Sequence, residues 1–142
     1  MQIRKVLTIG GSDSSGGAGI QIDLATFTQH KVFGYSVITA VTAQNSAGIN
    51  AIHNIPPEIV KEQIEAILED GKVQAAKIGM MGTRKNIEAT ADVLEEHKIA
   101  ELVIDPIYES SSGVSLISPA AYSLLKMRLF PLARVVTPNI FE

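Results

Sequence analysis

Short apolar runs alternate with amphipathic segments along the chain. The runs at 6–9, 35–42, 75–78, 102–104 and 134–137 predict five buried strands. Residues 50–55 fit either a short edge strand or a loop. Helical spacing of apolar positions follows at 19–29, after Pro57, after Thr83 and after Ser118. Because no linker or low-complexity segment interrupts this alternation, residues 1–142 are predicted to form a single domain.

The predicted helices have start signals and one-sided apolar faces. Thr83 and Ser118 are predicted N-caps, and Pro119 suits the first position of a helix. The residues expected to face inward are Ile59, Val60, Ile64, Ile67 and Leu68 in the helix after Pro57, Ile87, Ala91 and Leu94 after Thr83, and Leu124 and Leu125 after Ser118.

Strands that alternate with helices predict an α/β fold, with an open and mostly parallel sheet flanked by helices. In such sheets ligands bind at the carboxyl ends of the strands. We therefore expect a site at one edge of the sheet, with Gln44 and Asp105 on the same edge. The glycines, amides and carboxylates that follow the strands are Gly10–Gly19, Ala43-Gln44-Asn45, Gly79–Gly82, Asp105-Pro106, and Pro138-Asn139 with Glu142.

The segment Gly10–Gly19 is rich in glycine and joins the first strand to a helix, a layout that binds anions or small ligands. It matches neither common phosphate loop. Gly17 stands where a P-loop requires Lys, and the spacing lacks the third Gly of a dinucleotide fingerprint. A turn that binds nothing is the alternative. Asp13 is expected to hold this loop as an Asx turn rather than to take part in catalysis.

Composition narrows the class of protein. The net charge of −3 and the absence of a basic run argue against nucleic acid as a partner. No apolar run approaches the ~18 residues of a membrane span, and the first residues lack the apolar region of a signal peptide, so we expect a cytoplasmic location. The chain has no Cys, which excludes thiolate chemistry. The three histidines are scattered, and none is interpreted as a ligand or base.

Several motifs in order resemble the hydroxymethylpyrimidine and phosphomethylpyrimidine kinases of thiamin biosynthesis, in the ribokinase-like superfamily. Bacterial pyridoxal kinases share most of these motifs. The resemblance extends from end to end of the chain. The segments that carry it are GSDSSGGAGIQIDLATF (11–27), GYSVITAVTAQNSAG (34–48), KIGMMG (77–82), VIDP (103–106) and LFPLARVVTPNIFE (129–142).

The resemblance implies transfer of the γ-phosphoryl group of ATP, with Mg²⁺, to a hydroxymethylpyrimidine or its monophosphate. It places Gly11 and Asp23 in the substrate site, and Met80 and Ile107 as apolar walls. The amide of Gln44 is complementary to the amino group and ring nitrogen of an aminopyrimidine. Each residue also has an ordinary alternative: a loop amide for Gln44, core filling for Met80, and the helix dipole for Asp23.

On the metal side, the resemblance assigns Asp105 and Glu142 as Mg²⁺ carboxylates and places Asn139 near the phosphates. A strand-ending turn is the alternative for Asp105-Pro106. The sequence departs from the family pattern immediately after Pro106. The family usually continues with Val-Met and an apolar or small residue, whereas this chain has Ile107, Tyr108 and Glu109. This bulk and charge beside the expected pocket leave the choice of substrate open.

The family fold is about twice as long as this chain. The resemblance therefore implies an N-terminal substrate-binding half, with the catalytic base, the anion hole and most of the adenine pocket in the absent half. We expect a fragment, a truncated gene product or a separately expressed half, inactive alone. Its uncovered last strand favours a homodimer or larger self-association. The alternatives are a pyridoxal kinase, a non-catalytic pyrimidine-binding module and an unrelated α/β binding domain.

Overall fold

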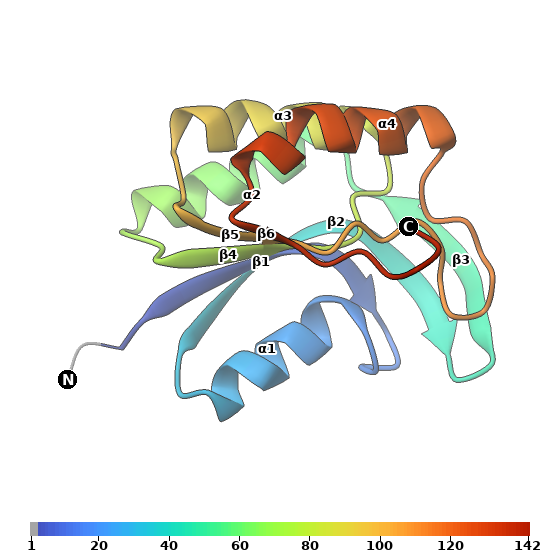
Figure 1. The fold of residues 1–142 in the computed structure, drawn as a ribbon. Helices are drawn as coiled ribbons and strands as arrows, with labels where there is room; N and C mark the ends of the chain where they lie inside the picture. Colours follow the sequence, from blue (N-terminus) through green and yellow to red (C-terminus); the bar gives the residue numbers. More distant parts are fainter. Residues whose placement is uncertain (1–2) are drawn as a thin grey trace.

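Six strands form one sheet in the order β3-β2-β1-β4-β5-β6 (Figure 1). The computed structural model describes residues 3–142. Five strands are parallel, and β3 runs antiparallel to β2 at one edge, which confirms the mostly parallel sheet and assigns residues 50–54 to an edge strand. The bounds are β1 Lys5–Asp13, β2 Phe33–Asn45, β3 Gly48–Asn54, β4 Ala75–Ile78, β5 Glu101–Ile104 and β6 Val135–Val136.

Helices cover both faces of the sheet (Figure 1). Helix α1 (Gly19–Gln29) lies on one face, where it packs against β1 and β2. The other face carries α2 (Pro57–Glu69), α3 (Arg84–Glu96) and α4 (Pro119–Arg128), followed by a 3₁₀ turn at Phe130–Leu132. The main core fills the space between the sheet and this three-helix layer. Within residues 3–142, each helix is too short or too polar to cross a membrane.

The predicted helix starts of α3 and α4 are confirmed. The Thr83 hydroxyl accepts a hydrogen bond from the Asn86 backbone N–H (3.1 Å), and the Ser118 hydroxyl accepts one from the Ala121 N–H (3.2 Å). The residues expected to face inward from these two helices are buried. Capping depends on residues within one helical turn, which is why the sequence alone predicts it well.

In α2 one expected core position is wrong. Val60 and Ile64 are fully buried, whereas Ile59 keeps 43% of its surface exposed. Residues four apart share a helix face, so Val60 and Ile64 point together into the core. Ile59 lies about 100° around the helix from Val60, which turns it toward solvent.

The two central strands extend beyond their apolar runs. β1 continues through Gly10–Asp13, which the sequence pattern assigns to a loop, and stays paired with β2 past a register shift between Gly10 and Gly11. β2 continues through Gln44, which pairs with Ile49 of β3 after a second shift. The expectation that Gln44 lies in a loop is therefore wrong. Backbone pairing with a neighbour, rather than side-chain hydrophobicity, sets where these strands end.

Helix α1 begins in close contact with β1. Gly19 has a φ of +61°, and a Cβ on this residue would lie 2.3 Å from the Gly11 carbonyl oxygen. A side chain would therefore meet backbone, which cannot move aside cheaply. Glycine at this position lets the helix start directly against the end of the strand.

We expect Gly19→Ala to lower the free energy of unfolding by about 1–3 kcal/mol or more, because it adds a left-handed backbone strain to the clash with Gly11. Urea denaturation measures this change. Gly17→Ala is the matched control, since its Cβ would find no atom closer than 3.7 Å. Equal stability of the two variants would show that the close approach is not a constraint.

Candidate functional site

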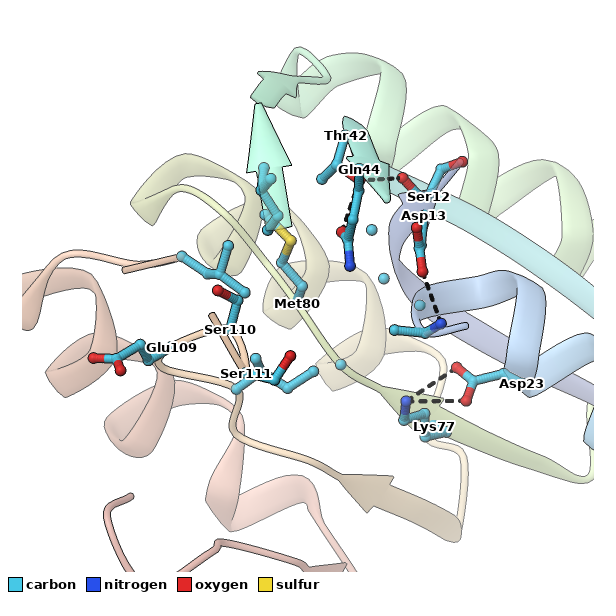
Figure 2. Close-up of a pocket in the computed structure, with 18 residues that line it drawn as sticks. Ser12, Asp13, Asp23, Thr42, Gln44, Lys77, Met80, Glu109, Ser110 and Ser111 are labelled. Atoms are coloured by element: carbon cyan, nitrogen blue, oxygen red, sulfur yellow. Dashed lines mark hydrogen bonds and ion pairs between the residues drawn. The ribbon is translucent and has the colours of Figure 1, made fainter. Parts of the chain in front are cut away.

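A pocket of about 240 Å³ opens at the carboxyl ends of β1, β2 and β4 (Figure 2). It lies between β1 and β4. The chain passes from β1 to β2 and β3 on one side of this point, and from β4 to β5 and β6 on the other side. Open α/β sheets bind ligands at such switch points. The structure brings together in this pocket all the residues expected on the substrate side: Gly11, Asp23, Gln44, Met80 and Ile107.

The carboxylate of Asp13 organises the Gly-rich segment. One oxygen accepts the Ser15 N–H (2.8 Å), the other accepts the Ala18 N–H (2.8 Å), and the Ser15 hydroxyl donates to both. Asp13 is only 3% exposed. Although this burial opposes ionisation, hydrogen bonds from Ser15, Ala18 and Gly17 outweigh it and lower the pKa of Asp13. The expected Asx turn is confirmed, and the loop uses these N–H groups on its own carboxylate.

Gln44 presents its side-chain amide to the pocket from the end of β2. Its backbone N–H donates to the Ser14 hydroxyl (2.9 Å), which donates in turn to the Gln44 carbonyl (2.8 Å). The Thr42 hydroxyl can donate either to the Ser12 carbonyl (2.9 Å) or to the Gln44 side-chain Oε1 (3.1 Å), and the amide nitrogen points into the cavity (Figure 2). The register shift beside Ala43 leaves Asn50 as an extra residue on β3, opposite Ala43 and Gln44.

Apolar side chains form the opposite wall. Met80 is buried in a small cluster with Ala40 and Leu116, against which Ile107 packs. Met80 therefore both fills the core and lines the pocket, so the interpretation as core filling and the interpretation as a pocket wall are compatible. A Cβ on Gly11 would lie 2.8 Å from the Met80 sulfur, so glycine keeps this side of the pocket open.

Asp23 is held from beneath the pocket by two strands. The Thr8 hydroxyl of β1 donates to Oδ2 (2.6 Å), and the Lys77 ammonium of β4 contacts both oxygens (3.1 and 3.0 Å). Lys77 lines the pocket and is a residue that the sequence interpretation missed. A signal was present, because a charged side chain is rare inside a short, central apolar strand and needs a partner there.

The C-terminal residues form a separate turn beside β5. Both side-chain oxygens of Glu142 accept backbone N–H groups, from Tyr108 (3.2 Å) and Asn139 (3.0 Å). The side-chain oxygen of Asn139 accepts the N–H groups of Phe141 (2.8 Å) and Glu142 (3.2 Å). Asn139, Glu142 and Asp105 are not among the residues that line the pocket.

Asp105 connects this turn to the pocket electrostatically. Burial raises the pKa of Asp105, Lys77 at 3.9 Å opposes the rise, and the carboxylates of Glu142 and Asp23 add to it. A set of oxygen donors whose mutual repulsion a cation would relieve fits Mg²⁺. Among residues 3–142 no three or more His, Asp or Glu side chains lie together as a metal-binding group.

The segment after Ile107 departs from expectation in one respect. Tyr108 packs edge-on against Tyr122, with ring centroids 5.3 Å apart, and is absent from the pocket lining. Glu109 does line the pocket, but its carboxylate points away from the cavity (Figure 2). Ser110 and Ser111, which the sequence interpretation did not single out, form the wall facing Gln44.

The family model for phosphomethylpyrimidine kinase matches residues 13–142. The chain belongs to this family. It is 49% identical over 140 residues to the hydroxymethylpyrimidine/phosphomethylpyrimidine kinase of Haemophilus influenzae, covering 99% of this chain and 52% of that protein. The chain thus spans about half the length of the curated relatives it matches.

Solved structures confirm the ribokinase-like fold expected from the resemblance. The phosphomethylpyrimidine kinase of Clostridium difficile 630 matches with a TM-score of 0.92 and 47% identity, over 98% of this chain and 60% of that one. The pyridoxal kinase of Staphylococcus aureus, in complex with pyridoxal, matches with a TM-score of 0.87 and 33% identity, over 99% of this chain and 52% of that one.

Replacing Asp13 with Asn should lower the free energy of unfolding at pH 7 by about 1–3 kcal/mol, because the amide turns a donor toward N–H groups that need an acceptor. A carboxyl whose folded pKa is lowered stabilises the protein above its unfolded pKa of about 3.9, and that stability is lost as the pH falls through the folded pKa. Urea unfolding from pH 7 to pH 3 should show the gap between the two proteins narrowing below about pH 4. A constant gap would contradict this account.

Proposed function

We propose that this chain is the substrate-binding half of an ATP-dependent kinase of thiamin biosynthesis. The kinase phosphorylates the hydroxymethyl group of 4-amino-5-hydroxymethyl-2-methylpyrimidine, its monophosphate, or both in turn. The supporting observation is that Gly11, Asp23, Gln44, Met80 and Ile107 line one pocket at the switch point of the sheet. Membership of the phosphomethylpyrimidine kinase family supports the choice of substrate class.

Gln44 supplies the recognition in this proposal. Its Nε2 donates to a ring nitrogen of the pyrimidine while its Oε1, steadied by Thr42, accepts from the exocyclic amino group. Met80 and Ile107 pack against the ring faces, and Asp23 accepts a hydrogen bond from the substrate. This pattern of polar groups at one end and apolar walls around the ring is typical of small-molecule sites.

Phosphorylation of pyridoxal is the second candidate. The Staphylococcus aureus relative, whose structure holds pyridoxal, has the same fold as this chain. A pyridine ring with a hydroxymethyl group would fit between the same apolar walls. It lacks the amino group beside a ring nitrogen that matches the amide of Gln44, so the aminopyrimidine remains the better substrate for this pocket.

The nucleotide side of the site is proposed for the turn beside β5. Asp105 and Glu142 would hold Mg²⁺, with Asn139 near the ATP phosphates. Bound Mg²⁺ would neutralise charge on the transferred phosphoryl group. We assign no catalytic base among the described residues. The base, the anion hole and most of the adenine pocket are proposed for the half of the family's length that this chain does not span.

Gln44→Ala should weaken binding of 4-amino-5-hydroxymethyl-2-methylpyrimidine by about 1–3 kcal/mol, the range for a bidentate contact to a base edge. The fold should survive, because the side-chain amide accepts only one hydrogen bond, from Thr42. Isothermal titration calorimetry measures the affinity. Asn45→Ala is the matched control, since this neighbouring amide does not line the pocket. An affinity unchanged by Gln44→Ala would remove Gln44 from recognition.

The 142-residue chain should show no ATP-dependent phosphorylation above background, whereas a chain extended to the length of its relatives should phosphorylate the aminopyrimidine. Loss of preorganised groups around the phosphate costs about 3–4 kcal/mol for each donor. A coupled assay of ADP release compares the two. Comparable turnover by the short chain would contradict the division into halves. A preference of the long chain for pyridoxal would favour the second candidate. Binding without turnover by the long chain would favour a non-catalytic module.

A further inference from the structure

The pocket contains a positively charged side chain, that of Lys77, which the proposed recognition of the substrate does not use. Lys77 lies in β4, between β1 and β5, and its neighbours Ala76 and Ile78 are buried in the main core. Its side chain turns to the other face of the sheet, toward α1, and is only 24% exposed. A lysine this enclosed is retained in a strand only when its charge is matched.

Lys77 is matched chiefly by Asp23. Its Nζ lies 3.1 and 3.0 Å from the two carboxylate oxygens, and the pair closes the base of the pocket in Figure 2. The buried Thr8 hydroxyl adds a hydrogen bond of 2.6 Å to Oδ2. Contacts from two strands to both oxygens fix the rotation of the Asp23 carboxylate, whose own backbone lies in α1.

The charges of the pocket point to the same residue. Lys77 is the one lysine or arginine among the pocket-lining residues, and the carboxylates there belong to Asp13, Asp23 and Glu109. Asp13 is satisfied within its own loop, and Glu109 points away. Asp23 is therefore the carboxylate facing a ligand, and Lys77 is its counter-charge. Lys77 also lies between Asp23 and Asp105, at 3.9 Å from the latter.

We propose that Lys77 is a positioning residue for the substrate. Its ammonium holds the Asp23 carboxylate in the orientation that receives the aminopyrimidine. The ammonium also lies between the carboxylates of Asp23 and Asp105, so that the Asp23 carboxylate remains turned toward the substrate. This inference rests on the proposed function. It differs from a purely structural ion pair between β4 and α1, because such a pair would affect stability without affecting affinity through Asp23.

A double-mutant cycle on the 142-residue chain tests the proposal, with calorimetric titration of 4-amino-5-hydroxymethyl-2-methylpyrimidine. Lys77→Met should weaken binding about tenfold or more, and Lys77→Arg should recover affinity to within about threefold of the parent. In a background of Asp23→Asn, Lys77→Met should change affinity less than about threefold, since the carboxylate it positions is gone. If Lys77→Met does not fold, Lys77→Gln replaces it with the same expectations.

Lys61→Met is the matched control. It removes an ion-paired lysine on α2, whose Nζ lies 3.5 Å from Glu65, outside the pocket. It should leave affinity unchanged. Equal affinity of Lys77→Met and the parent, or an equal loss in both Asp23 backgrounds, would overturn the role of Lys77. If the parent chain does not bind the aminopyrimidine, both the proposed function and this inference fail. If the parent chain binds and Lys77→Met binds equally well, only this inference fails.

Discussion

The parallel pairing of β1 with β2 on one side and β4 on the other is the constraint on which the site depends. Ile9 lies between Val37 and Ile78 in this register, and all three are fully buried. Because a shift of one residue would turn an apolar side chain to the wrong face, burial pins the register. The same register carries the polar ends of the three strands to one edge, where the pocket forms.

The Gly-rich segment contributes shape rather than an empty anion site. Asp13 occupies the N–H groups of Ser15 and Ala18 that a bound anion would otherwise use. Gly11 and Gly19 let α1 begin against the strand and leave room beside Met80. These two N–H groups are therefore committed to the loop's own carboxylate, whereas the N-terminus of α1 that follows has no side-chain cap.

Charge is divided between two regions. The pocket offers an amide, apolar walls and one paired carboxylate, which suits a polar aromatic ring of low charge. Beside β5, burial and the neighbouring carboxylates raise the pKa of Asp105 while Lys77 opposes the rise, and we propose the metal side of the site there. The proposed kinase would need both environments next to each other, since a neutral alcohol and a metal-bound phosphate must meet.

The sequence by itself determined the alternation of strands and helices, the N-caps Thr83 and Ser118, and which residue types follow each strand. These features depend on neighbours within a turn or two, so a local pattern encodes them. Tertiary structure alone decided that β2 extends through Gln44 and that Lys77 meets Asp23, 54 residues away in the chain. Strand ends and ion pairs depend on which distant segment lies alongside, and a local pattern carries no record of that partner.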